Sequence, residues 1–530
     1  MTTGAMQRVV LIGGGFGGVF TARHLQRQAR GRIAIELISR NNFFVFQPLL
    51  PEVAGGGIHP ADAVVPLRLF LPGVSVRVAE VRAVDLVNKA VHVTVGRGGE
   101  IAQLAYDQLV IALGQVVDLS RTPGLADRAL VMKDVTDAFH IRNHVLGCLE
   151  EAATTADARR RAILLSFAVI GGGFTGVETV GEVQELIRKA LRFYPSLRGE
   201  DIRIVLLQHA ARILPELPEH LAAYAADRLR RRGVEILVKT GVKAAHLDRI
   251  ETDTGRTIDA GTIIAAIGNA PSPLVQRLGL PCEHGQIVVD RHLRVAGCDD
   301  LWALGDNARI PLGDAGAANP AYAPPLAQFA YQEAKVLAAN ILAGIDGQPL
   351  APFVYRARGT MASLGGRQGV AEIMGVKFSG SLAWAAWRLF YLGLIPGLST
   401  RIRIATDWLL DLLVSRSIVE IRASRSPSRL LQFFAGDVVV EPGIEPGGVY
   451  VVASGEFLID TPDDPASPPR SLGAGGWFGA RFRDQALAPN ERARAGTDAV
   501  AYFVDQEDLQ RLATVRALID DLDRATPPSG

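Results

Sequence analysis

Two short apolar runs, far apart in the chain, end in the same arrangement of glycines. Residues 9–12 read Val-Val-Leu-Ile and are followed by GGGFGG at 13–18, and residues 168–170 read Ala-Val-Ile and are followed by GGGFTG at 171–176. An apolar run that ends in a turn signal is typical of a buried strand. The pattern predicts two strand–turn–helix units, whose first glycines, Gly13 and Gly171, lie 158 residues apart.

Each unit is suited to hold a dinucleotide. Only glycine makes so tight a turn after the strand, and the next helix offers unpaired N–H groups and its positive dipole end to a pyrophosphate. One such match is a weak signal, but two copies in the same context are a strong one. We therefore expect two dinucleotides on one chain. The alternative is a pair of glycine-rich turns in two ordinary strand–helix–strand units.

The order of the segments indicates which dinucleotide each unit holds. A fingerprint at the extreme N-terminus with a later strand ending in Gly-Asp is typical of FAD-binding proteins, and here residues 301–304 are followed by Gly305 and Asp306. The Asp306 carboxylate is expected to bond the ribityl and pyrophosphate region. Another strand, at 109–113, ends in Gly114, where glycine allows close backbone approach to the flavin. The second fingerprint lies between these strands, which predicts an inserted nicotinamide-binding domain.

From residue 9 to about residue 419 the chain resembles the type II NADH dehydrogenases. Besides the glycine loops, the resemblance is carried by NNFFVFQPLL at 41–50, RILP at 212–215, AQFAYQ at 327–332 and GTMASLG at 359–365. Many flavoproteins share the glycine loops, whereas QPLL and AQFAYQ are much more specific. Members of this family pass electrons from NADH through FAD to quinone without pumping protons. The resemblance therefore implies an FAD-dependent NADH:quinone oxidoreductase.

The fingerprints and the resemblance together give the expected cofactor-binding residues. For FAD they are Gly13, Gly15, Phe16, Gly17, Gly18, Ser39, Arg40, Gln47, Gly114 and Asp306. For the nicotinamide cofactor they are Gly171, Gly173, Phe174, Thr175, Gly176, Gln208 and Gly268. No metal site is expected.

Two of these positions depart from the usual pattern. The strand before Ser39 usually ends in an acidic residue that accepts a hydrogen bond from the FAD ribose, and the Ser39 hydroxyl can still make that bond. At Gln208 the family usually has glutamate, which bonds the 2′-OH of NADH and repels a 2′-phosphate. The neutral amide of Gln208, with His209 and Arg212 nearby, removes this repulsion. NADPH is therefore an alternative donor.

Three side chains are candidates for the reaction itself. By resemblance, Glu178, expected in the first turn of the helix after the second fingerprint, positions the nicotinamide or relays a proton. Its alternative role is to stabilise the helix N-terminus. Gln328 and Gln332 lie four residues apart on the helix expected after residues 324–325, so their amides share one face, which the family places beside the quinone. Two solvent-facing glutamines are the alternative.

The region between residues 382 and 414 combines apolar and cationic residues. No segment of the chain has about 18 uninterrupted apolar residues, so a spanning helix is not expected. Two amphipathic helices are predicted on either side of residues 396–397, and they carry three of the five tryptophans. Such helices are expected to lie in the lipid headgroup layer with their cations toward anionic lipid, here Arg388, Arg401, Arg403 and Arg416. The alternative is a buried helical hairpin in the interface of a homodimer.

From residue 430 the pattern changes to short apolar runs separated by glycines, which is typical of a β-roll. This portion resembles the cyclic-nucleotide-binding domains, ending in an amphipathic helix with Leu509, Leu512, Val515, Ile519 and Leu522 on one side. However, Ala480 stands where that family has the ribose-binding glutamate, and Pro489 lies near the place of its phosphate-binding arginine. Arg481, Arg483 or Arg492 remain as substitutes. We predict a degenerate β-roll for docking or dimerisation rather than a cyclic nucleotide sensor.

Composition limits the remaining function classes. With 21% charged residues and a net charge of +1, the 530-residue chain shows no sign of a nucleic-acid partner. Its cysteines form no Cys-x-x-Cys pair, so no redox dithiol is encoded. A sulfide:quinone reductase would need one cysteine in place of the second glycine loop and one beyond Asp306, and the chain has neither. The first strand begins near Arg8, which leaves no room for a signal peptide. We expect the protein on the cytoplasmic face of the inner membrane.

Together these patterns predict an α/β fold with two Rossmann-like dinucleotide-binding domains of the FAD/NAD-linked reductase type. The FAD-binding domain is expected at 1–125 and 286–380, with the quinone-site helix in its second part, and the NAD(P)H-binding domain at 126–285. Amphipathic membrane-contact helices are expected at 381–425 and the β-roll at 426–530. Two other functions remain open: a flavin-bearing sensor that signals through the β-roll, and a soluble reductase with a different electron acceptor.

Overall fold

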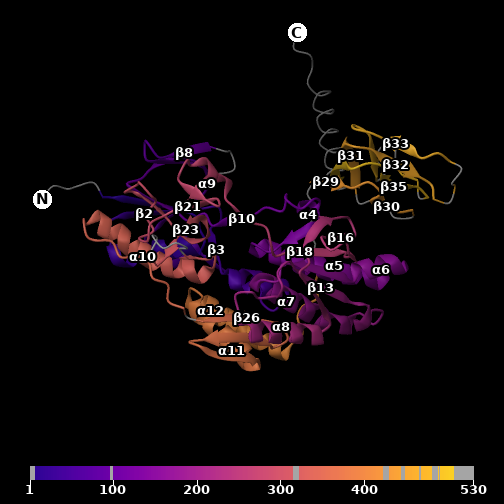
Figure 1. Cartoon of the computed structure of the whole chain (residues 1–530), viewed down its shortest axis with the longest axis horizontal. Coiled ribbons are helices and arrows are strands. Elements are labelled where there is room, and N and C mark those ends of the chain that lie inside the picture. Colours follow the sequence, from indigo (N-terminus) through magenta and orange to yellow (C-terminus); the bar gives the residue numbers. More distant parts are fainter. Residues whose placement is uncertain are drawn as a thin grey trace, which may run out of the picture.

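The computed structural model describes residues 6–95, 100–313, 321–357, 359–421, 429–442, 448–462, 464, 467–479, 487–488 and 490–505. Two five-stranded parallel sheets form its centre, and helices cover their faces (Figure 1). Parallel strands are buried on both faces, which explains why the strands of these sheets read as continuous apolar runs. The predicted α/β class with two Rossmann-like units is confirmed.

The first sheet has the strand order β22 (Leu301–Ala303), β9 (Gln108–Ile111), β1 (Arg8–Ile12), β2 (Ala34–Ser39) and β5 (Ser75–Val78). Helix α1 (Phe16–Ala29) connects β1 to β2 and packs against α10 (Ala327–Ile345). A small antiparallel sheet of β6 (Glu80–Asp85), β7 (Ala90–Val95) and β8 (Glu100–Ala105) follows β5. Strand order reverses between β9 and β1, beside the first glycine turn.

The second sheet has the order β11 (Ala129–Val131), β18 (Thr262–Ala265), β12 (Ser166–Ile170), β13 (Arg203–Gln208) and β14 (Val234–Val238). Its main helices are α5 (Val135–Thr154), α7 (Phe174–Ala190) and α8 (Glu219–Arg231). The chain enters this unit through β10 (Gln115–Val117) and returns through β19 (Asn269–Pro271). These two connecting strands pair antiparallel, with Val116 opposite Ala270.

An antiparallel sheet of β26 (Thr360–Ser363), β27 (Gly369–Ile373) and β28 (Val376–Gly380) leads into α11 (Ser381–Leu394) and α12 (Leu398–Leu413). The predicted break between these two helices is confirmed. Both helices lie at the bottom of the view in Figure 1, near α8, and the short helix α2 (Leu50–Ala54) packs on α5 and α7. In the described ranges, every helix is too short or too polar to cross a bilayer.

The C-terminal part forms two antiparallel four-stranded sheets around one apolar core. The first sheet has the order β29 (Arg429–Phe433), β36 (Ala499–Asp505), β31 (Gly448–Ser454), β34 (Trp477–Gly479), and the second β30 (Val438–Val440), β35 (Arg492–Ala495), β32 (Phe457–Asp460), β33 (Arg470–Leu472). Phe433, Phe457 and Phe478 fill the core. The predicted terminal helix, together with Ala480, Arg481, Arg483 and Pro489, lies outside the described residues.

Candidate active site

A cavity of about 630 Å³ opens at the carboxyl edge of the first sheet. Its wall comes from the glycine turn after β1, from the ends of β2, β9 and β22, and from the start of α10. Ligands of open α/β sheets bind at this edge, where the strand order reverses. Among the residues predicted to hold FAD, all except Gly18 line the cavity: Gly13, Gly15, Phe16, Gly17, Ser39, Arg40, Gln47, Gly114 and Asp306.

The first glycine turn has the shape that a pyrophosphate needs. Gly13 has φ +121°, and a Cβ there would overlap the carbonyl oxygen of Ala112. A Cβ at Gly18 would overlap the Gly13 carbonyl oxygen, so this glycine lets α1 pack closely on the turn. By contrast, a Cβ at Gly15 would meet no atom within 4 Å, because Gly15 faces the open cavity at the start of α1. The residues present therefore fit FAD.

The second glycine turn repeats this arrangement. Gly171 has φ +105°, and a Cβ at Gly176 would overlap the Gly171 carbonyl oxygen. A Cβ at Gly173 would again meet nothing within 4 Å, and α7 begins at the next residue, Phe174, with Thr175 exposed. Gly268, just after β18, packs its backbone against Leu119. A second backbone cradle of the same shape is thus available for the nicotinamide dinucleotide.

Carboxyl and amide groups that the sequence did not single out support the floor of the first cavity. Asn307, which follows β22, binds the end of β9. Its Oδ1 accepts from Gly114 N at 2.9 Å, and its Nδ2 donates to Ile111 O at 3.1 Å. Glu333 accepts from Gly305 N at 2.8 Å, and burial raises its pKa to about 8. Burial also raises the pKa of their neighbour Asp306, which the sequence did predict at this site. The only sequence signal for Glu333 is that it is the single acid in α10.

Ser39 and Gln208 occupy equivalent places at the ends of β2 and β13. Ser39 is buried and lines the first cavity, where its hydroxyl lies beside Gly14. Gln208 binds the second glycine turn: its Oε1 accepts from Gly172 N at 3.1 Å, and its Nε2 donates to Arg212 O at 3.3 Å. A carboxylate at this position could not donate to Arg212 O, so the surrounding backbone matches an amide better than a carboxylate.

A second, smaller cavity of about 60 Å³ lies between α1, α10 and α11. This aromatic slot is lined by Phe16, Phe20, Phe46, Pro48, Ala327, Gln328, Tyr331, Gln332, Phe390, Tyr391 and Leu394. Gln328 donates to Gly359 O at 3.0 Å and accepts from the Tyr355 hydroxyl at 2.6 Å. Gln332 donates to Arg356 O at 3.0 Å and accepts from Arg356 N at 3.1 Å. Both amides are therefore held by the segment 355–359.

Glu178 is buried between three elements. It is the fifth residue of α7, past the first turn in which it was expected, and it lines neither cavity. Its Oε1 accepts from Ser363 N of β26 at 2.9 Å and from Trp387 Nε1 of α11 at 3.0 Å. Burial raises the pKa of Glu178 to about 8, even though both hydrogen bonds favour the charged form.

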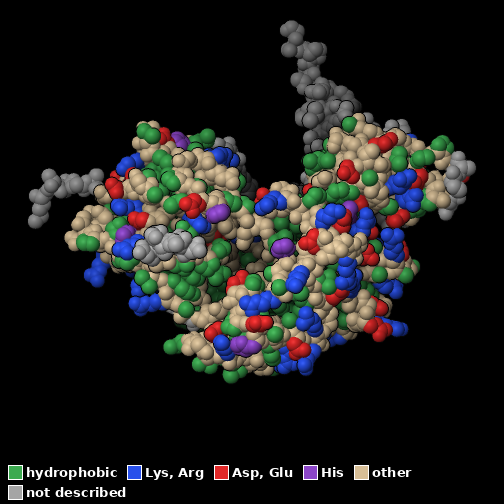
Figure 2. Space-filling model, viewed as in Figure 1, with side chains coloured by type: hydrophobic (Ala, Val, Ile, Leu, Met, Phe, Trp, Pro, Cys, Tyr) green, Lys and Arg blue, Asp and Glu red, His purple; other side chains and the backbone are tan. Residues whose placement is uncertain are grey.

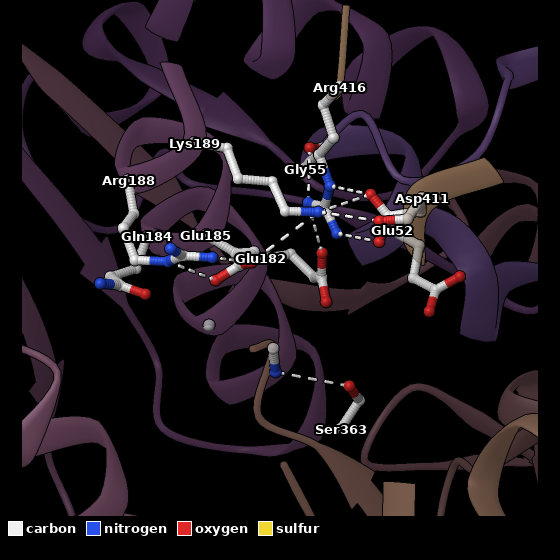
Figure 3. A network of polar contacts seen from close by, with 12 residues as sticks. Glu52, Gly55, Glu182, Gln184, Glu185, Arg188, Lys189, Ser363, Asp411 and Arg416 are labelled. Carbon is white, nitrogen blue, oxygen red and sulfur yellow. Dashed lines mark hydrogen bonds and ion pairs between the residues drawn. The ribbon is translucent and has the colours of Figure 1, made fainter. Parts of the chain in front are cut away.

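A buried ionic network joins the helix pair α11–α12 to both dinucleotide-binding units. Figure 3 shows Arg416 pointing between Gly55, Glu182 and Asp411; its guanidinium donates to Gly55 O at 2.7 Å, to Glu182 at 2.9 Å and to Asp411 at 2.8 Å. Arg388 pairs with Glu52 at 3.2 Å. The prediction that Arg388 and Arg416 face lipid is therefore wrong, because buried carboxylates on α2 and α7 pair with them.

Comparison with known proteins identifies the family. Residues 7–334 match the family model described as pyridine nucleotide-disulphide oxidoreductase, and residues 358–417 match that of the NDH2 C-terminal domain. The type II NADH:quinone oxidoreductase Ndh of Mycobacterium tuberculosis is 33% identical over 422 residues, which cover 77% of this chain and 89% of that protein. The chain belongs to the type II NADH:quinone oxidoreductases.

Further similarities agree with membership of the type II NADH:quinone oxidoreductases. Demethylphylloquinone reductase NdbB of Synechocystis is 31% identical over 417 residues, covering 77% of this chain and 96% of that protein. The structure of NDH2 from Plasmodium falciparum in complex with NADH aligns with a TM-score of 0.72 at 21% identity, over 78% of this chain and 99% of that chain. FAD is the typical cofactor of such proteins. Neither family model extends beyond residue 417, so the resemblance of the β-roll stays a prediction.

Proposed function

We propose that the protein is an FAD-dependent NADH:quinone oxidoreductase that pumps no protons, with its nicotinamide unit bounded by β10 and β19 rather than by the predicted residues 126 and 285. The observation that carries this proposal is the contact between the two cavities. The FAD cavity and the aromatic slot share Phe16 and Ala327 as lining residues. A quinone head group in the slot would therefore lie next to the group held by the first cavity.

The chain's own residues bind and orient the reactants. Gly15 and the start of α1 would hold the pyrophosphate of FAD, and Gly173 and the start of α7 that of NADH. Bound FAD would supply the redox chemistry, which is hydride acceptance from NADH and two-electron reduction of a quinone. Phe46 and Tyr391 keep water from the slot, while Gln328 and Gln332 supply the polar groups at its edge.

We assign peripheral membrane contact to the outer faces of α11 and α12. Most of the large side chains exposed there are aliphatic, with Arg403 as an exception: Leu382, Leu389, Leu398, Ile402, Leu409, Leu410, Leu412, Leu413 and Val414. Figure 2 shows that, in this view, hydrophobic side chains on the lower part of the molecule lie among charged ones. An exposed aliphatic patch on a protein surface marks an interaction site. Arg388 and Arg416 are buried, and the exposed Arg403 is paired with Asp62, so aliphatic insertion rather than attraction to anionic lipid supports the contact.

For the C-terminal sheets we propose docking on the nicotinamide unit rather than nucleotide sensing. Asp437, 2% exposed, has its Oδ1 3.4 Å from His246 Nδ1 and 3.6 Å from Arg249. Gln432 N donates to Asp127, and Arg128 donates to Gln432 O. Arg492, one of the arginines left for a cyclic phosphate, instead forms two 2.9 Å bonds with Asp460.

A direct test uses the purified full-length protein with vesicles that contain a long-chain quinone. We expect a yellow protein whose flavin is bleached by NADH, recovers its colour when quinone is added, and floats with the vesicles. Absence of bound flavin, or bleaching without reoxidation by quinone, would contradict the proposed function. Flotation is read separately, so a soluble but active protein would refute only the membrane contact.

NADPH use depends on Gln208. Replacing Gln208 with Glu should raise the apparent KM for NADPH by about tenfold or more, with a much smaller change for NADH, because the carboxylate repels the 2′-phosphate. The ratio of kcat/KM for the two donors measures this effect. Gln103→Glu, at an exposed position of β8, is the matched control and should leave the ratio unchanged. An unchanged ratio in Gln208→Glu would mean that the ribose lies away from the end of β13.

A further inference from the structure

We propose that Trp387 of α11 is a positioning residue for the reaction, whose indole N–H holds the Glu178 carboxylate while its ring supports the wall of the aromatic slot. This inference rests on the proposed quinone reduction. It makes the helix that carries exposed leucines a part of the reducing site. The helix would then be more than an anchor.

The geometry places Trp387 between the acid and the slot. The side chain is only 1% exposed, and its Nε1 lies 3.0 Å from Glu178 Oε1. Its ring packs on Tyr391, one helical turn later, with centroids 4.7 Å apart at 64°. Tyr391 in turn lines the slot and meets the Phe46 ring at 5.9 Å. A single indole therefore touches both the carboxylate and the slot wall.

Few groups other than Trp387 affect the pKa of Glu178. Glu182 on α7 and Glu52 on α2 are the charged groups that act on it, and both disfavour a further negative charge. Glu182 pairs with Arg416, and Glu52 pairs with Arg388. The donors to Glu178 are the N–H groups of Ser363 and Trp387, and the charge of Glu178 also acts on Tyr391 of α11. Removing one of two donors should therefore change markedly how tightly Glu178 holds a proton.

Quinone reduction consumes a proton that Glu178 could supply. In NADH + H⁺ + quinone → NAD⁺ + quinol, the hydride carries two electrons and one proton, and the medium supplies the second proton. With a pKa near 8, Glu178 holds a proton at neutral pH. Such an acid suits donation of that second proton toward the slot, through Tyr391 or an ordered water. Turnover that needs protonated Glu178 falls as pH rises through its pKa.

The test is Trp387→Phe in the full-length, flavin-loaded protein. Phenylalanine keeps an aromatic ring on Tyr391 but has no N–H, so the ionised form of Glu178 loses a donor and its pKa rises. We expect the alkaline limb of the kcat–pH profile to move about one to two pH units higher. The rate of flavin bleaching by NADH should change little.

A second readout needs neither NADH nor quinone. The infrared C=O band of the protonated Glu178 carboxyl is assigned by its loss in Glu178→Gln. Its titration midpoint should equal that of the alkaline limb of the kcat–pH profile, and Trp387→Phe should move this midpoint to higher pH. In the Glu178→Gln background, Trp387→Phe should add no further shift of the rate profile. Trp384→Phe, on the same helix but stacked on Arg388 at 4.2 Å, is the matched control and should leave the midpoint in place.

Unmoved midpoints in Trp387→Phe, with folding and flavin content intact, would overturn the proposal. Equal shifts in Trp384→Phe would do the same, because they would point to a general disturbance of α11. If Trp387→Phe fails to fold, Trp387→His, which restores a ring N–H donor, must recover the wild-type midpoint for the proposal to stand. Failure of the wild type to reduce quinone would instead reject the proposed function, so the two failures are distinguishable.

Discussion

Replacement of Arg416 by alanine is expected to lower the free energy of unfolding by about 3–5 kcal/mol, because it leaves buried carboxylates without their cation. Arg416 is 4% exposed and donates to Glu182, Asp411 and the Gly55 carbonyl. Removal of one partner of a buried pair costs far more than the pair itself contributes. Chemical denaturation followed by flavin and tryptophan fluorescence measures the change.

Arg403→Ala is the matched control for this prediction. Arg403 also pairs with a carboxylate, Asp62 at 2.6 Å, but its side chain is 54% exposed. Exposed pairs contribute about 0–1 kcal/mol, so this variant should unfold almost as the wild type does. Equal losses of unfolding free energy in Arg403→Ala and Arg416→Ala would show that burial does not determine how much an ion pair contributes to stability.

The same network determines what truncation of the chain should do. Ending the chain before residue 381 removes Arg388 and Trp408 from Glu52, Trp387 from Glu178 and Arg416 from Glu182. We therefore expect such a protein to misfold rather than to become a soluble reductase. A chain that ends near residue 425 keeps all of these contacts, loses the C-terminal sheets, and should stay active.

Gly15→Val is expected to give a folded protein without FAD and without any NADH oxidation. Gly15 has φ −86°, which any residue adopts, and a Cβ there would meet no protein atom within 4 Å. The new isopropyl group would instead occupy the space that the pyrophosphate needs at the start of α1. Flavin absorbance per protein and the far-ultraviolet circular dichroism spectrum measure cofactor loss and folding separately.

Gly173→Val makes the paired measurement at the other cradle. Its backbone is extended in the same way, with φ −74°. This variant should keep its flavin, which dithionite still bleaches, but should lose bleaching by NADH. Retention of FAD in Gly15→Val, or loss of FAD in Gly173→Val, would mean that the two dinucleotides are assigned to the wrong turns.

The sequence predicted those features that depend on neighbouring residues. Both glycine turns follow apolar strands and combine residues within six positions, so their backbone geometry follows from local pattern. The break between α11 and α12 also follows from a local Pro-Gly pair. Gln328 and Gln332 share a face because helical spacing requires it, although their partners at 355–359 could not be inferred from spacing.

Contacts between distant segments explain what the sequence did not reveal. Trp387 lies 209 positions after Glu178, and the Glu182–Arg416 pair spans 234 positions. An arginine beside an apolar helical stripe most often reaches solvent or a lipid headgroup, which is why Arg388 and Arg416 were assigned outward. Only tertiary packing brings Glu52 of α2 to Arg388 and Glu182 of α7 to Arg416.

The paired strands β10 and β19 have a consequence for the ancestry and engineering of the chain. Because Val117 stands opposite Asn269, the polypeptide leaves the first sheet and returns to it at one point. A unit whose ends meet in this way satisfies the main requirement for insertion into a host gene without displacing the host fold. The nicotinamide unit therefore already has adjacent termini for circular permutation, whereas its excision would leave Arg416 and Trp387 without Glu182 and Glu178.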